Sequence, residues 1–333
     1  MSANETVTDS IQKQTQLTVL KQDENNDFVV QHPNGNLCVI ENTYAEMFPM
    51  WLGRILITAA TEKWALTAAQ SATGYAASVI MSPAEAGIET LVSPNKTLDN
   101  RPGIIIQIHH VRGHELKTQM ITRIGQCIMT CPTTAAFDVL PNPTKKLKVG
   151  RSLSLFGDHF QTKDVFNNRT IWRIPVMEGE FLVEDRFGVK RGVAGGNFLI
   201  LAQDQMAGLK AAESAVLSMK GIEGIILPFP GGVCRSGSKV GSLKYKLTAS
   251  TNHYYCPTLK NFISDSKLSP EVNSVYEIVV NGLNLEVVKQ AMTLGITAAS
   301  SIPGIKKITA ANYGGKLGPY KASLKDFLKR ESE

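Results

Sequence analysis

The 333-residue sequence has no apolar run that approaches the roughly 18 residues that a membrane-spanning helix needs. Its first 16 residues, MSANETVTDSIQKQTQ, are polar and lack the apolar core of a signal peptide. The five cysteines are odd in number, scattered and without C-x-x-C spacing, which favours free thiols in a reducing compartment over disulfides or a zinc site. Together these absences predict a cytoplasmic protein.

Signatures of several functional classes are also missing. There is no G-x-S-x-G serine motif, and SGSKVGS at 236–242 lacks the spacing of a P-loop. The stretch KRGVAGGNF at 190–198 begins like an RNA-binding motif, but Val193 and Gly195 stand where that motif needs stacking aromatic rings. We therefore expect no nucleic-acid partner.

Clusters of metal-binding or charged side chains are few. The stretch QIHHVRGHE at 107–115 groups His109, His110 and His114 with Glu115, but their spacing fits neither H-E-x-x-H nor another ligand set. We expect a polar loop after a strand here, and no metal. The formal net charge of +6 is dispersed along the chain, so it permits an anionic partner without identifying one.

The amino-terminal part predicts an extension followed by a hairpin. Residues 1–16 are expected to be disordered or peripheral, and residues 1–36 form the extension. The stretch DFVVQHPNGNLCVIEN at 27–42 indicates a hairpin, because Asn34-Gly35 is typical of a tight turn with positive φ angles. Residues 43–46, TYAE, have the S/T-x-x-E form of a capping box, which predicts a helix.

The rest of the first half alternates strands and helices. The pattern predicts a strand at 54–60, a helix at 62–73, a strand at 76–81 and a strand at 103–109. A second helix follows, in which apolar residues recur at helical spacing before Pro132: Leu116, Met120, Ile124, Cys127 and Ile128.

The second half repeats strand, helix, strand in two units, residues 197–232 and 276–315. Two such units side by side make a ferredoxin-like layer, and the first half looks like a degenerate version of it. The sequence therefore predicts an α+β fold with two related ferredoxin-like lobes. The expected parts are the lobes at 37–150 and 193–328, an irregular insert at 151–192 and a tail at 329–333.

Glu277 stands out within SVYEIVVNGL, residues 274–283. In a strand it shares a face with Val275 and Val279, in a segment that otherwise indicates burial. Desolvation would raise the pKa of this carboxyl, which suits a group that lends and recovers a proton near neutral pH. The alternative, a carboxylate paired with a Lys or Arg at an edge or interface, stays open.

Four glycine-rich stretches are expected at strand ends or turns: GVAGGNF (192–198), PFPGG (228–232), SGSKVGS (236–242) and NYGGKLG (312–318). Glycine lets the backbone approach a ligand closely and aim its N–H groups at it. The alternative is a set of tight turns that bind nothing. Position in the sequence does not decide between these interpretations.

These motifs, taken in order, resemble one family. The stretches at 54–89, 123–138, 178–188 and 193–198, followed by PFPGG, SKVGS, ASTN (249–252), VYEIVVNGLN and NYGGKLG, are similar to formylmethanofuran:tetrahydromethanopterin formyltransferases. The resemblance covers roughly residues 37–328. It includes the formyltransferase subunit of the bacterial formyltransferase/hydrolase complex.

The resemblance implies transfer of a formyl group between methanofuran and N5 of tetrahydromethanopterin, through a ternary complex and without a covalent formyl-enzyme. It implies two coenzyme substrates, no prosthetic group or metal, and either a homo-oligomer or a place in a hydrolase complex. The rival hypothesis is a non-catalytic subunit that binds the pterin or scaffolds such a complex. The physiological direction does not follow from the sequence.

The resemblance places the catalytic glutamate of the family at Glu277. We expect the glycine turns and their neighbours to bind the coenzymes. The candidate binding residues are Gly195, Gly196, Asn197, Gly231, Gly232, Ser238, Lys239, Ser250, Thr251 and Asn252.

Overall fold

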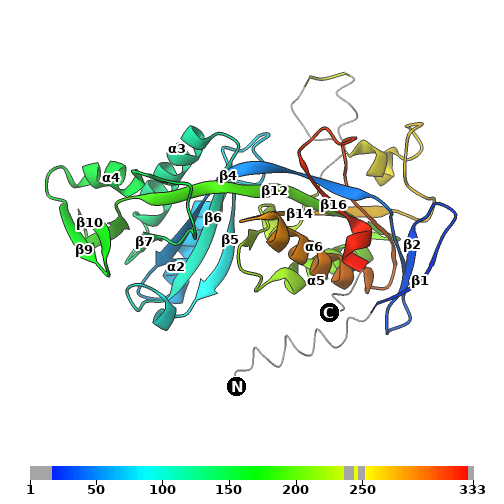
Figure 1. Ribbon diagram of the computed structural model, residues 1–333, viewed down its shortest axis with the longest axis horizontal. Coiled ribbons are helices and arrows are strands. Elements are labelled where there is room, and N and C mark those ends of the chain that lie inside the picture. Colours follow the sequence, from blue (N-terminus) through cyan, green and yellow to red (C-terminus); the bar gives the residue numbers. More distant parts are fainter. Residues whose placement is uncertain (1–16, 236–243, 247–251, 329–333) are drawn as a thin grey trace.

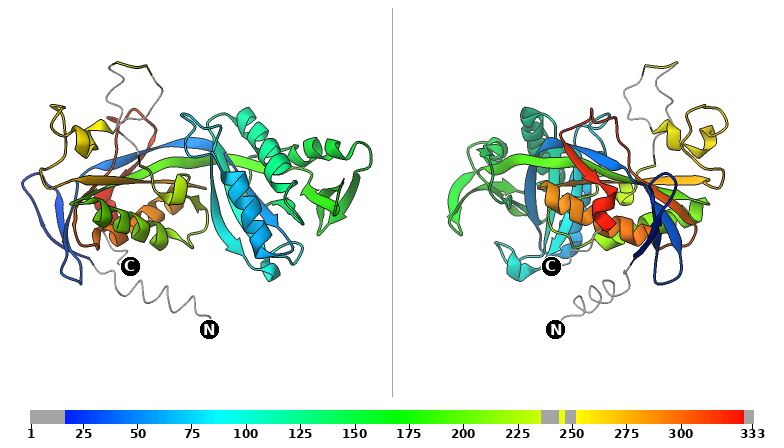
Figure 2. Two further views of the ribbon diagram at one scale, coloured as in Figure 1. Left: turned by 180° about the vertical axis from the view of Figure 1, so that it is seen from behind. Right: turned by 45° about the vertical axis from the view of Figure 1, so that its right-hand side comes forward.

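The computed structural model describes residues 17–235, 244–246 and 252–328 of the chain. The molecule is elongated, with one lobe at each end of its long axis (Figure 1). Two long strands, β4 (Tyr44–Thr58) and β12 (Phe187–Ala202), pair antiparallel between the lobes and run through both of them (Figures 1 and 2). The lobes therefore share one continuous sheet.

The first lobe is built on β4. Its other elements are α2 (Glu62–Thr73), β5 (Glu85–Val92), β6 (Gly103–His110), α3 (Gly113–Arg123) with a π-helical turn (Ile124–Ile128), and β7 (Ala135–Asp138). The strands lie in the order β7-β4-β6-β5, and all neighbours are antiparallel. Four buried alanines of α2 let the helix pack closely on isoleucines of β4 and β6.

The second lobe is built on β12. Its other elements are α5 (Gln205–Met219), β13 (Ile225–Ile226), β14 (Ser274–Gly282), α6 (Leu285–Ser300) and β15 (Ile305–Thr309). The strands lie in the order β15-β12-β14-β13, again with antiparallel neighbours. Helices α5 and α6 lie side by side against this sheet (Figure 1). Both lobes thus repeat one order of elements and one order of strands.

Shorter elements complete the structure. The strands are β1 (Thr18–Gln22), β2 (Phe28–Gln31), β3 (Leu37–Ile40), β8 (Lys145–Leu147), β9 (Thr162–Phe166), β10 (Arg169–Val176), β11 (Gly179–Glu184) and β16 (Tyr320–Ser323). Among the described residues, the short helices are α4 (Val149–Leu153) and the 3-10 turns Pro94–Lys96, Ser154–Gly157, Pro230–Gly232, His253–Tyr255, Pro257–Leu259 and Leu324–Leu328. Within the described part of the chain, no helix is long and apolar enough to span a membrane.

The predicted hairpin at 27–42 is confirmed, since β2 and β3 pair antiparallel and Gly35 has a φ of 84°. The helix predicted from the capping box at 43–46 is wrong, because these residues lead into β4. The Glu46 carboxylate is fully buried and accepts the backbone N–H groups of Tyr313 (3.0 Å) and Leu317 (3.2 Å). Its partners are thus a distant loop, which the local motif could not reveal.

The strand predicted at 76–81 is also wrong. This stretch is irregular, and the second strand of the lobe is β5, from Glu85 to Val92. The backbone turns directly after α2, where Tyr75 has a φ of 46°. An apolar run alone does not distinguish a strand from a loop that packs under a helix.

The segment predicted to be an irregular insert, 151–192, is largely regular. Strand β10 pairs antiparallel with β9 and β11, and β12 already begins at Phe187. Strand β11 pairs parallel with β7, which attaches this small sheet to the first lobe. The predicted lobe boundaries themselves remain predictions.

Candidate active site around Glu277

Glu277 lies in the middle of β14. Its neighbours on the other face, Tyr276 and Ile278, are buried in the core beneath α5 and α6. Glu277 itself is half-buried, as are Val275 and Val279 on its own face. Strand alternation therefore directs the carboxylate to the face opposite the helices. The sequence predicted the face shared with Val275 and Val279, but not its position relative to the helices.

Both sides of Glu277 are fixed by sheet pairing. On β12 the residue opposite is Leu199, and on the other side the backbone of Cys234 exchanges two hydrogen bonds with that of Glu277, at 2.8 and 3.1 Å. Cys234 follows the PFPGG turn. The carboxylate is thus carried by a strand whose backbone is held along both edges.

Asn252 lies beside the carboxylate, and its side-chain amide donates to Glu277 Oε2 at 3.4 Å. The 3-10 turn His253–Tyr255 holds Asn252 in place, since the backbone N–H of Tyr255 donates to the Asn252 carbonyl at 2.9 Å. His253 Nε2 lies 3.2 Å from Asp265 Oδ2. The sequence predicted Asn252 but missed His253 and Asp265, although the run of three rings in HYY was a signal of an anchored turn.

Asn197 is on the same face of the sheet, since it stands opposite Val279. Its Oδ1 accepts the backbone N–H of Ala311 at 2.8 Å, and its Nδ2 donates to the Gly195 carbonyl at 3.2 Å. Asn197 therefore ties β12 to the chain leading into the NYGGKLG loop. That loop is also held by Glu46.

The two glycines before Asn197 face different surroundings. Gly195 has a φ of 82°, which favours glycine. A Cβ added to Gly196 would lie 2.6 Å from Val288 Cγ1 and 3.2 Å from Met292 Sδ, both on α6. Gly196 thus allows α6 to pack on the sheet, which favours the fold-only alternative at this position.

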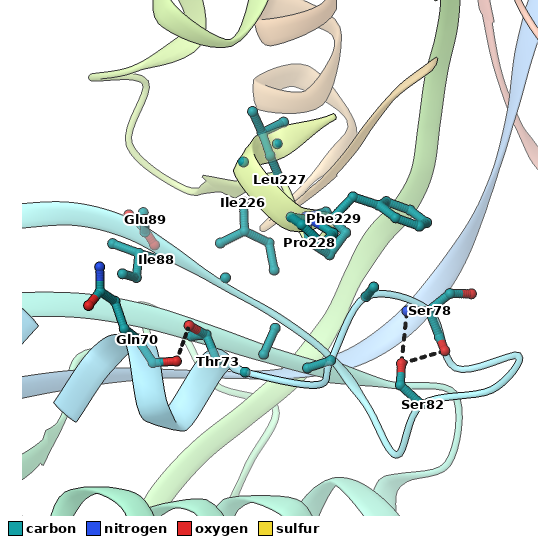
Figure 3. Close-up of a pocket in the computed structure, with 18 of the residues that line it drawn as sticks. Gln70, Thr73, Ser78, Ser82, Ile88, Glu89, Ile226, Leu227, Pro228 and Phe229 are labelled. Atoms are coloured by element: carbon teal, nitrogen blue, oxygen red, sulfur yellow. Dashed lines mark hydrogen bonds between the residues drawn. The ribbon is translucent and has the colours of Figure 1, made fainter. Parts of the chain in front are cut away.

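Gly231 and Gly232 lie elsewhere, in a pocket of about 960 Å³ between the lobes (Figure 3). One wall comes from the end of α2, the segment 74–82 and β5, and the other from α5, β13 and the PFPGG turn. Ile88, Ile226, Leu227 and Phe229 make it largely apolar. Its charged lining residues are Glu89 and Lys220, and Glu277 is not among the lining residues.

The two glycines differ within this pocket. Gly231 has a φ of 63° and no atom within 4 Å of an added Cβ, so its backbone is open to a ligand. A Cβ on Gly232 would lie 2.9 Å from Leu227 and from Val216, in addition to the strain of its φ of 81°. The predicted binding residues thus divide between the Glu277 face and the pocket. Ser238, Lys239, Ser250 and Thr251 lie outside the described residues.

The stretch 107–115, predicted to be a polar loop, instead contains the end of β6 and the start of α3, which carries His114 and Glu115. His109 and His110 are buried, and His109 Nε2 lies 2.8 Å from Gln107 Oε1. Burial lowers the pKa of His109 to about 3. No group of three or more potential metal ligands occurs among the residues that the structure describes. We infer a structural role for His109.

The fold and site define a two-lobed α+β protein in which one of two repeated layers carries a half-buried carboxylate beside an amide. The family model described as formylmethanofuran-tetrahydromethanopterin formyltransferase matches residues 34–176, and that described as FTR, proximal lobe, matches residues 179–327. The chain belongs to this formyltransferase family.

Individual relatives agree. The formylmethanofuran--tetrahydromethanopterin formyltransferase of Methanocaldococcus jannaschii is 54% identical over 293 residues, which are 87% of this chain and 97% of that protein. The enzyme of Methanosarcina barkeri is 51% identical over 290 residues, 87% of this chain and 98% of the relative.

Two solved structures are also similar. The formyltransferase from Methanosarcina barkeri has a TM-score of 0.83 and 50% identity, and covers 86% of this chain and 97% of its own. The formyltransferase/hydrolase complex (FhcABCD) from Methylorubrum extorquens, in complex with methylofuran, has a matching chain with a TM-score of 0.84 and 43% identity. That match covers 91% of this chain and 99% of the other.

Proposed function

We propose that this chain moves a formyl group between methanofuran and N5 of tetrahydromethanopterin, with Glu277 as the group that handles the proton. Membership of the formyltransferase family supports the reaction, because the relatives that carry this name match over nearly their whole length. The observation that carries the role of Glu277 is its half-buried carboxylate, presented on the face opposite the helices with the Asn252 amide 3.4 Å away.

The chemistry needs few groups. An amine attacks the formyl carbon, a tetrahedral oxyanion forms, and the other nitrogen leaves after gaining a proton. Protonated Glu277 donates a hydrogen bond to the oxyanion or passes its proton to the leaving nitrogen, and it then recovers a proton from the attacking amine, so that the transfer balances. A donor aimed at a developing oxyanion contributes roughly 3–4 kcal/mol to the transition state. Holding both coenzymes in register supplies much of the remaining rate, with no covalent formyl-enzyme.

The coenzymes would bind along the glycine turns. The open backbone at Gly231 and the apolar walls of the inter-lobe pocket suit a ring or chain with few charges. Lys220 at the pocket offers a partner for a carboxylate or phosphate. Asn252 and Glu277 lie outside this pocket, and we propose that they contact the reacting nitrogen and formyl group where the bound coenzymes reach the Glu277 face.

We also propose that both lobes are ferredoxin-like, split β-α-β layers. The strand orders β7-β4-β6-β5 and β15-β12-β14-β13 support this, since each places the first and third strands of its unit at the centre. The cytoplasmic location also stays a proposal. The free thiols of Cys38, Cys127, Cys131 and Cys256 support it.

For partners, we propose either a homo-oligomer or a place in a formyltransferase/hydrolase complex, and coenzyme substrates without a resident prosthetic group. The similarity to a chain of the Methylorubrum complex supports the second arrangement. Copurification from native extract distinguishes them, since hydrolase subunits would accompany the chain only in the complex.

A coupled absorbance assay with both coenzymes tests the reaction. We expect formyl exchange by the purified protein in both directions. Binding of either coenzyme without exchange would support the non-catalytic pterin-binding or scaffolding role instead. Calorimetric titration of each coenzyme, run on the same preparation, separates that outcome from a preparation that has lost its fold.

A further inference from the structure

A backbone irregularity marks the place where β12 passes from the first lobe to the second. Up to residue 194, β12 pairs with β4, and Val193 stands opposite Gly282 of β14. The next partner pair is Gly196 with Val280, so the register shifts there. Gly195 lies within this shift, with a φ of 82°. Its N–H is therefore diverted from the regular ladder and needs another acceptor.

Asn281 supplies that acceptor. Its Oδ1 accepts the Gly195 N–H at 2.9 Å, and its Nδ2 donates to Glu85 Oε2 at 2.6 Å. Asn281 is fully buried, and Glu85 is 6% exposed. One side chain of β14 thus satisfies the shifted strand of the second lobe and holds a carboxylate on β5 of the first lobe.

The other oxygen of Glu85 leads to the inter-lobe pocket. Oε1 accepts the backbone N–H of Val79 at 3.2 Å, within the segment that forms one pocket wall. The lobes also touch closely beside this link, because a Cβ on Gly87 would lie 2.9 Å from Ile226 Cβ. A continuous path of hydrogen bonds therefore joins the pocket wall, Glu85, Asn281 and the backbone of β12.

Asn281 lies four residues after Glu277 on the same strand and, by alternation, on the same face. A change in the position of Asn281 therefore moves the strand that carries Glu277. We propose that Glu85 and Asn281 are positioning residues that fix β14 and the shifted part of β12, and so align Glu277 with the pocket wall of the first lobe. This role rests on the proposed function of Glu277.

The alternative is that the hydrogen bond between Glu85 and Asn281 contributes to the stability of the fold alone. Because one side chain donates and the other accepts, substitutions at Glu85 and Asn281 can exchange donor and acceptor, and this exchange distinguishes positioning from stability. Asn281→Asp keeps the acceptor for the Gly195 N–H but turns the donor that faces Glu85 into a second carboxylate oxygen. Adding Glu85→Gln restores one donor and one acceptor between the two positions, with polarity reversed and the same total charge.

We expect Asn281→Asp to lower kcat by about 10- to 100-fold, and the double variant Glu85→Gln/Asn281→Asp to recover to within about fivefold of wild type. The KM values for both coenzymes should change less than kcat. Assays are run well below each melting temperature and corrected for the folded fraction measured by circular dichroism. Ser300→Ala is the matched control, because it removes a buried hydrogen bond to His32 at the end of α6 without touching this path.

Hydrogen–deuterium exchange gives a readout that does not depend on activity. Peptides covering residues 193–198 and 274–282 should exchange faster in Asn281→Asp and return to wild-type rates in the double variant. Unchanged kcat in Asn281→Asp, or an equal loss in a stable double variant, would overturn the positioning role. An inactive wild type would overturn the proposed function instead. Even then, unchanged peptide exchange in Asn281→Asp would refute the positioning of β12 and β14 by Glu85 and Asn281.

Discussion

The two lobes share one strand order but differ on the face of the sheet that the helices leave open. In the first lobe that face is closed. Ile171 from β10 packs with Leu56, Ile105, Ala135 and Phe137, and every residue of β6 is buried. In the second lobe the same face carries Val275, Glu277 and Val279, all half-buried. Among the described residues, its cover is a cluster in which Tyr255, Leu268 and Val272 pack with Leu199 and Leu201 of β12.

This difference assigns a role to each covering segment. The strands β9 to β11 cover part of this face of the first lobe, where Phe166, Ile171 and Leu182 pack with Ile105 of β6. Of the residues that the structure describes, the segment 252–272 covers part of this face of the second lobe, and Asn252 brings an amide to the Glu277 carboxylate. The same architecture thus serves as a support in one lobe and presents a carboxylate in the other.

The largest effect is expected where the second lobe is open. Glu277→Gln should lower kcat by about 100-fold or more, because the amide keeps the shape and a donor but cannot exchange a proton. Coenzyme binding and thermal stability should remain near wild type. Steady-state rates and calorimetric affinities check both expectations.

Glu271→Gln provides the control for this substitution. It removes an exposed carboxylate that lies 3.3 Å from Lys306 Nζ, and activity should stay unchanged. If Glu277→Gln lowered kcat by less than tenfold, Glu277 would not be the group that transfers the proton.

The next largest effect is expected on the free energy of unfolding, from substitutions in the segments that cover the two sheet faces. Ile171→Ala should cost about 3–4 kcal/mol of the free energy of unfolding, because it leaves a cavity in a closed, fully buried layer. Leu268→Ala, at the edge of the partial cover, should cost about 2 kcal/mol, since its surroundings relax more easily. Chemical denaturation measures both. Equal costs would mean that the two faces are equally closed.

The free energy of unfolding should also depend on pH, because His109 of the first lobe is buried. Burial holds the pKa of His109 near 3, against an ordinary value of 6.5. Between these values the unfolded chain binds a proton that the folded chain does not, so stability falls as pH falls from 6.5 towards 3. His109→Gln stays neutral and removes this term. Relative to that variant, the wild type should lose about 2 kcal/mol between pH 6.5 and pH 5.

Denaturation curves for both proteins across this pH range make the comparison. Asp138, whose pKa is raised by burial, titrates in both proteins, so its contribution cancels in the difference. Glu85, whose pKa burial also raises, stands directly opposite His109, so the comparison is repeated in the Glu85→Gln background. A constant difference between the two proteins across the range would show that His109 takes up a proton within the folded lobe.

The contrast between the lobes also shows what the sequence alone predicts. Val288, Met292, Gly295 and Ala299 recur at helical spacing and are all buried on α6. Alternation in β14 correctly placed Glu277 on one face with Val275 and Val279, although that face is half-buried and not fully buried as expected. These patterns depend on neighbours a few residues apart, and such local periodicity reflects burial directly.

The failures involve partners that are distant in the chain. Glu46 matched a capping box, yet the two N–H groups from which it accepts hydrogen bonds belong to Tyr313 and Leu317, 267 and 271 residues away. Asn281 and Glu85 are separated by 196 residues, and neither stood out from its local context. The glycine turns were together predicted to bind the coenzymes, but only the folded chain separates Gly196, which faces α6, from Gly231, which faces the pocket.

The smallest effect on stability is expected at Gly231, and it separates ligand binding from backbone strain. Gly231 and Gly35 have φ angles of 63° and 84°, and neither has an atom within 4 Å of an added Cβ. Each change to Ala should therefore cost a similar amount, about 1–2 kcal/mol, through the left-handed backbone alone. Gly35 lies in the β2-β3 hairpin, whereas Gly231 lines the inter-lobe pocket.

If the pocket binds a coenzyme, Gly231→Ala should also raise the KM for that coenzyme severalfold, because the new methyl group occupies open space beside the ligand. Gly35→Ala should leave both KM values unchanged at the same loss of stability. Matching melting temperatures establish that the strain is equal in the two variants. If the strain is equal and the KM values of Gly231→Ala are unchanged, the PFPGG turn does not contact a coenzyme. The coenzymes would then bind at the Glu277 face.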